Sequence, residues 1–97
     1  MTPADFQRSL TRSRPPECAP ALQALWWAAR DHWDAAHNIV MAHEDMDCAW
    51  VHAHLHRVEG DLDNARYWYR RAGKRPATGA VEAERDAIIA ALVQQTT

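Results

Sequence analysis

Residues 48–73 read CAWVHAHLHRVEGDLDNARYWYRRAG, and they decide the fold because an earlier segment carries many of the same residues in one fixed register. The spacing is 30 residues, and the matching pairs are Cys18 and Cys48, Ala19 and Ala49, Leu25 and Leu55, Asp31 and Asp61, Ala35 and Ala65, and Ala42 and Ala72. An internal period of this length is typical of stacked helix–turn–helix units. The sequence therefore predicts two tandem antiparallel helical hairpins.

The composition favours an all-α domain and excludes some classes of function. The 97 residues are 47% hydrophobic with only three glycines, and no stretch alternates apolar and polar residues as a half-buried strand does. The formal net charge of −2 provides no general attraction to nucleic acid or to an anionic membrane. No apolar run approaches the ~20 residues of a membrane-spanning helix. Without a signal-like N-terminus, we expect a cytoplasmic protein with reduced cysteines.

Caps and helix breakers predict a single helical-repeat domain over residues 1–97. Thr2 and Pro3 start a short N-terminal helix, and Pro16 ends the linker that follows it. Gly60 closes a later helix, as a glycine in the left-handed conformation commonly does. The expected segments are repeat 1 at about 17–44 with helices at 17–30 and 33–43, repeat 2 at about 47–75 with helices at 47–59 and 62–72, and a C-terminal capping helix at about 80–95.

The second unit resembles a tetratricopeptide repeat over residues 48–76. Small residues, a turn glycine, a bulky aromatic and a large apolar residue occupy the matching places: Ala53, Gly60, Ala65, Tyr69 and Ala72, with Leu62 after the turn. The first unit departs from the pattern, because Arg30 replaces the turn glycine and Ile39 replaces the aromatic. Residues 50–73 are also similar to small uncharacterised bacterial proteins, and this similarity implies a fold without an activity.

The resemblance implies an inner groove that binds an extended peptide or a partner's helix. The residues expected to line the groove are Trp27, Asp47, Trp50, His54 and Arg57. Tryptophan and arginine are enriched at the residues that dominate binding energy in interfaces. The alternative is that Trp27 and Trp50 are covered by the N-terminal segment or by the capping helix, since a small core uses its large side chains.

These observations predict a non-catalytic protein-binding module, for example an adaptor or an inhibitor of the immunity-protein type. The expected partner is a protein or peptide, without a cofactor and without a membrane. Two hairpins are fewer than a repeat stack usually has, so exposed ends also permit a homodimer. The sequence contains no glycine-rich phosphate loop and no nucleophile turn, so we expect a protein that is not an enzyme.

Three alternating histidines raise the alternative of a metal or small-ligand site, with possible catalysis. On a helix, His52 and His56 share one side, whereas His54 points to the other. A metal site would need a third ligand, which Glu59 or His37 would supply. We expect instead that His52 and His56 pack against the helix at 62–72 and hold no metal.

A basic segment follows, and it raises a second alternative of contact with phosphate or nucleic acid. Its cations are Arg66, Arg70, Arg71, Lys74 and Arg75, interleaved with Tyr67, Trp68 and Tyr69. Cations near a helix C-terminus also stabilise the helix dipole, and some of the aromatics are expected in the core. The overall charge argues against nucleic acid as the partner, because a general nucleic-acid binder is basic overall.

Overall fold

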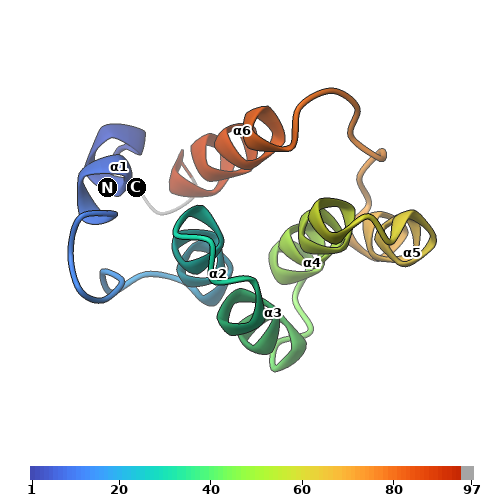
Figure 1. The fold of residues 1–97 in the computed structure, drawn as a ribbon, viewed down its shortest axis with the longest axis horizontal. Coiled ribbons are helices and arrows are strands. Elements are labelled where there is room, and N and C mark those ends of the chain that lie inside the picture. Colours follow the sequence, from blue (N-terminus) through green and yellow to red (C-terminus); the bar gives the residue numbers. More distant parts are fainter. Residues whose placement is uncertain (95–97) are drawn as a thin grey trace.

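The computed structural model describes residues 1–94, and the regular elements in that part of the chain are all helices (Figure 1). They are α1 (Pro3–Ser9), α2 (Pro20–Ala29), α3 (Trp33–Met41), α4 (Met46–Glu59), α5 (Leu62–Ala72) and α6 (Val81–Gln94). The predicted all-α class is confirmed. Residue 95, the expected end of the last helix, lies outside the described residues. Among residues 1–94, no helix has the length and hydrophobicity that crossing a bilayer requires.

Local chemistry explains where the helices begin. Thr2 accepts a hydrogen bond from the Asp5 amide, and the Asp5 carboxylate accepts one from the Thr2 amide, which together cap α1. Asp45 caps α4 by accepting from the Cys48 amide at 2.8 Å. The predicted start of the first repeat helix at residue 17 is wrong, because α2 begins at Pro20. A proline disfavours helical geometry at the residue before it, and Ala19 is extended with ψ 152°.

The helix ends use the left-handed conformation at three turns. Gly60 ends α4 with φ 89°, and Gly73 ends α5 with φ 70°. Between α2 and α3 the same role falls to Asp31, whose φ is 63°. Aspartate tolerates this conformation better than most residues, so the first repeat makes a tight turn without a glycine.

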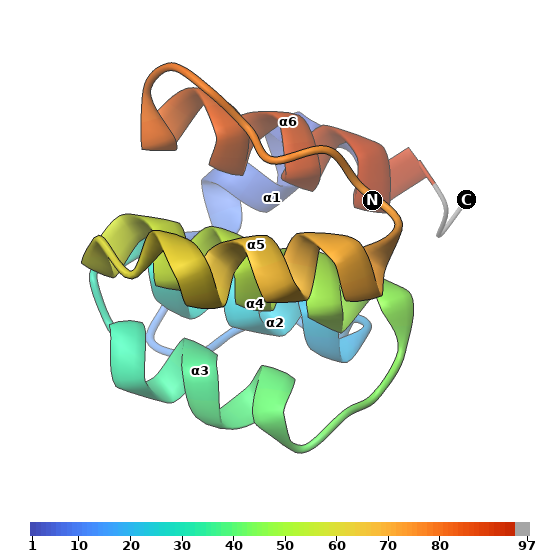
Figure 2. The same ribbon diagram turned by 90° about the vertical axis from the view of Figure 1, so that its right-hand side faces the viewer.

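Helices α2 to α5 form a curved row in which neighbours in sequence lie side by side (Figure 1). Helix α2 packs on α3 and α4 packs on α5, while α3 and α2 both contact α4. Figure 2 shows α3 on one side of α4 and α6 on the other. Leu62 was expected to fill an apolar slot in this row, but it is 53% exposed because it begins α5 at the edge of the interface.

Helix α6 does not cap the end of the row, as a terminal capping helix would. It lies across α2 and α4, with α1 beside it (Figure 1). Its buried residues Ile88, Ile89, Leu92 and Val93 join the main core with those of α2 and α4. Because α6 packs on both α2 and α4, the expected inner face of the repeats is covered.

Candidate functional site

Helix α6 covers two of the residues that were expected to line an inner groove. His54 is 1% exposed, and its Nδ1 lies 2.8 Å from Glu84 Oε1 on α6. Arg57 donates to the same carboxylate oxygen from Nη1 at 3.1 Å and to the Gly79 carbonyl oxygen from Nη2. The prediction that His54 and Arg57 face a partner is wrong, because both side chains fasten α6 to α4.

Glu84 is the buried acid at the centre of this contact. The Tyr69 hydroxyl donates to its second oxygen, so donors from α4 and α5 meet one carboxylate. Burial raises the pKa of Glu84, but hydrogen bonds from His54, Tyr69 and Arg57 more than offset this and hold the pKa below its usual value. Burial and the neighbouring carboxylate together raise the pKa of Tyr69.

The other expected groove residues are half-buried. Trp27 meets the rings of Trp26 and His32 edge to face, with centroids 4.9 and 5.5 Å apart. Trp50 packs against the core, and Lys74 Nζ lies 4.2 Å from its ring centroid. Asp47 lies in the first turn of α4. The alternative in which neighbouring segments cover the two tryptophans agrees better with the structure than an open groove does.

The basic segment forms an exposed face along α5 and the turn after it. Its five cations are all exposed: Arg66, Arg70, Arg71, Lys74 and Arg75. Arg66 pairs with Asp63, and Arg71 donates to the Tyr67 hydroxyl at 2.8 Å. Arg71 also lies 5.4 Å from the Trp68 ring centroid. Several of these cations therefore have local partners, which weakens the case for a dedicated phosphate site.

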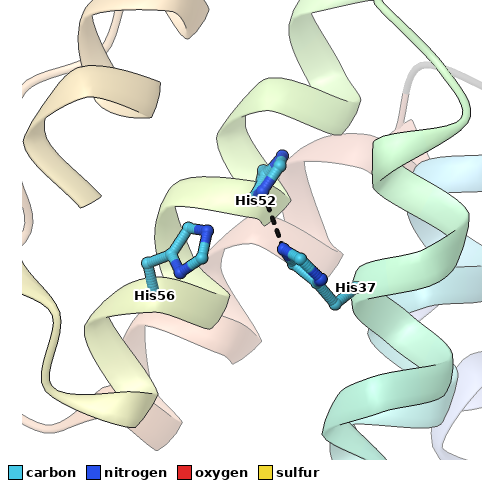
Figure 3. Close-up of side chains that lie close together, drawn as sticks. All are labelled: His37, His52 and His56. Atoms are coloured by element: carbon cyan, nitrogen blue, oxygen red, sulfur yellow. Dashed lines mark hydrogen bonds between the residues drawn. The ribbon is translucent and has the colours of Figure 1, made fainter. Parts of the chain in front are cut away.

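The structure brings three histidines together on the opposite side of α4 from α6. His52 and His56 leave α4 one turn apart and point toward His37 on α3 (Figure 3). The Nε2 atoms of His37 and His52 are 3.1 Å apart. One ring nitrogen from each histidine lies within 4.8 Å of the other two. The set weighed as an alternative metal site thus exists as a spatial cluster.

Aromatic neighbours fix the orientation of these rings. Trp33 stacks on His37 with centroids 4.6 Å apart, and Trp68 stacks on His52 at 3.9 Å. His52 is 4% exposed; burial, together with the neighbouring His56 and His37, lowers its pKa to about 4. Burial also lowers the pKa of His37. His52 is therefore a neutral imidazole at neutral pH, with a lone pair on one ring nitrogen. The expectation that it packs against α5 agrees with its Trp68 contact.

A carboxylate orients the third ring. Nδ1 of His56 lies 2.5 Å from Glu59 Oε1, one turn along α4. When Nδ1 donates its proton to this oxygen, Nε2 of the neutral ring is the free acceptor. Metal-binding histidines usually have their second nitrogen held by a carboxylate or carbonyl in this way. Glu59, which was considered as a direct ligand, lies where it orients His56.

The cluster opens into a cavity of about 380 Å³ between α3, α4 and α5. Its lining residues are His37, Met41, His52, His56, Asn64 and Trp68. The sequence indicated the α3 side of this cavity, because Trp33, His37 and Met41 follow one another at four-residue spacing and so share one side of a helix. No feature of the sequence indicated that Glu84 is buried, because it lies between the acidic surface residues Glu82 and Asp86.

Comparisons with protein-family models, with curated proteins and with solved structures found no match for this chain. Its resemblance to tetratricopeptide repeats therefore stays a prediction. Function has to be inferred from the geometry of the sites.

Proposed function

We propose that this protein binds a first-row transition-metal ion through His37, His52 and His56. One observation carries the proposal: imidazole nitrogens from two helices converge within 4.8 Å of one another at the wall of an open cavity. Imidazole is the commonest protein ligand for such ions. Three histidines with an open side also match the usual donor count of a metal site that keeps a position free.

The distances support this assignment. Two nitrogens that bind one tetrahedral zinc ion, each at about 2.0–2.1 Å, are roughly 3.3 Å apart. The 3.1 Å between the His37 and His52 Nε2 atoms is close to that edge length. The Nδ1 atom of His56 is paired with Glu59, which leaves Nε2 for a metal ion, and one ring nitrogen of His56 lies within 4.8 Å of the ligand nitrogens of His37 and His52.

A purely structural role for the three rings is the main rival. In the structure His37 and His52 share a hydrogen bond between their Nε2 atoms at 3.1 Å, and His56 Nδ1 is paired with Glu59. A metal ion would replace the proton that His37 and His52 share. Metal binding is favoured by the cavity that lies against the rings and by the partial exposure of His37, which together give an ion access to the site.

Isothermal titration with Zn²⁺, using protein without a tag and stripped of metal, tests the proposal. We expect one ion per chain, and we expect His37→Ala and His52→Ala to lower the affinity at least tenfold, about 1.4 kcal/mol of binding energy. His43→Ala is the matched control, since His43 is exposed and outside the cluster. Co²⁺ absorption in the visible range reports the geometry. A folded wild-type protein that binds neither of these ions nor copper(I) would refute the proposal.

A further inference from the structure

Met41 is a large apolar residue that the fold leaves at the mouth of the histidine cavity. It is 62% exposed, whereas methionine is usually buried. It ends α3 one turn after His37, so the two side chains share one side of the helix. Both residues line the same cavity as His52 and His56. A thioether and three imidazoles thus line one cavity in the part of the chain that the structure describes.

The chemistry of these donors distinguishes between metals. Thioethers are soft ligands that select copper(I), whereas zinc sites use thiolate, imidazole or carboxylate. The four groups are also neutral when they bind, and the nearest carboxylate, Glu59, is engaged with the outer nitrogen of His56. A neutral donor set in a half-buried site suits a monovalent ion better than a divalent one, because less uncompensated charge is buried.

The wall of the cavity beside the ligands is neutral. Trp68 lines the cavity, but its ring is stacked on His52 with centroids 3.9 Å apart and has Arg71 5.4 Å from its centroid, so it holds the His52 ring in place. Asn64 is the other lining residue from α5, and it is neutral. The cavity therefore has no acidic lining residue among those described.

We propose that the site is selective for copper(I), with Met41 Sδ as a sulfur ligand at the mouth and the three histidines as nitrogen ligands. This inference rests on the proposed function, since it names the metal of that same site. Copper(I) enters and leaves as an ion, so no change of oxidation state is part of the proposal. The sulfur at the exposed end is the first ligand that an incoming ion meets.

The test compares Met41→Leu with Met46→Leu, which removes an equally exposed thioether outside the cavity. Both are made in a Cys18→Ser background, because the half-buried Cys18 thiol would compete for copper(I). Copper(I) affinity is measured without oxygen by competition with bicinchoninate, and Zn²⁺ affinity is measured in parallel. We expect Met41→Leu to lower copper(I) affinity at least tenfold and to leave Zn²⁺ affinity unchanged, with Met46→Leu unchanged in both.

X-ray absorption of the copper(I) form gives an independent reading. We expect a sulfur neighbour in the parent protein and in Met46→Leu, and none in Met41→Leu. Unchanged copper(I) affinity and an unchanged sulfur signal in Met41→Leu would overturn the copper assignment while the histidine site stands. If His52→Ala also leaves the copper(I) and Zn²⁺ affinities unchanged, the metal site itself is rejected. Because Met41 is exposed, Met41→Leu is expected to fold, and circular dichroism checks this.

Discussion

Glu84 shows how much one side chain contributes when three donors surround it. Its carboxylate accepts hydrogen bonds from His54, Arg57 and Tyr69, and it is buried between α4, α5 and α6. Removing one member of a buried charged network leaves the others without compensation, which costs about 3–5 kcal/mol. We expect Glu84→Gln to lower the free energy of unfolding by about that amount at pH 7. Glu82→Gln, on the exposed side of the same helix, is the control.

The lowered pKa of Glu84 also gives this contribution a pH dependence with a definite sign. A carboxyl group whose pKa is lower in the folded than in the unfolded protein stabilises the fold fully above its ordinary value of 4.5. The stabilisation is lost as the pH falls through the folded value. In urea unfolding, the difference between wild type and Glu84→Gln should therefore be largest near neutrality and shrink below pH 4.5. A difference that stays constant to low pH would show that Glu84 acts through packing alone.

At the scale of helices, the seam between α4 and α5 is built from small residues. Ala53 and Ala65 are fully buried where the two helices cross, with Tyr69 beside them. Ala65→Leu should overpack this crossing and lower the free energy of unfolding by about 1–3 kcal/mol. Thermal melts measure the loss, and Ala35→Leu, at the half-buried matching position of the first repeat, is the comparison. An Ala65→Leu protein as stable as wild type would mean that α4 and α5 cross elsewhere.

Helix bounds followed from the sequence where a cap or a glycine marks them. Helix α5 begins after Asp61 and ends at Gly73 as predicted, because both residues satisfy backbone groups locally. The position of α6 could not be predicted in this way, because no cap or glycine indicates which helices its apolar side packs against. In the structure that side joins the core of α2 and α4, and Glu84 meets donors from α4 and α5.

At the scale of the whole molecule, the histidine site joins two helix pairs. The spacing of His52 and His56 indicated that they share a side, but the approach of His37 depends on how α3 crosses α4. A local pattern carries no information on such a crossing. The expected groove failed for the same reason, because local sequence patterns did not indicate that α6 packs over it.

Because its ligands come from α3 and α4, a bound ion should hold the two pairs together. An ion that binds only the folded chain stabilises it by about 2.7 kcal/mol at a free concentration of 100 times the dissociation constant. We expect the urea midpoint of wild-type protein to rise with added metal and that of His37→Ala to rise much less, since His37 is the histidine ligand on α3 and leaves only the Met41 thioether of that helix at the site. His43→Ala should respond as wild type does. An equal rise in His37→Ala would show that His37 does not bind the ion.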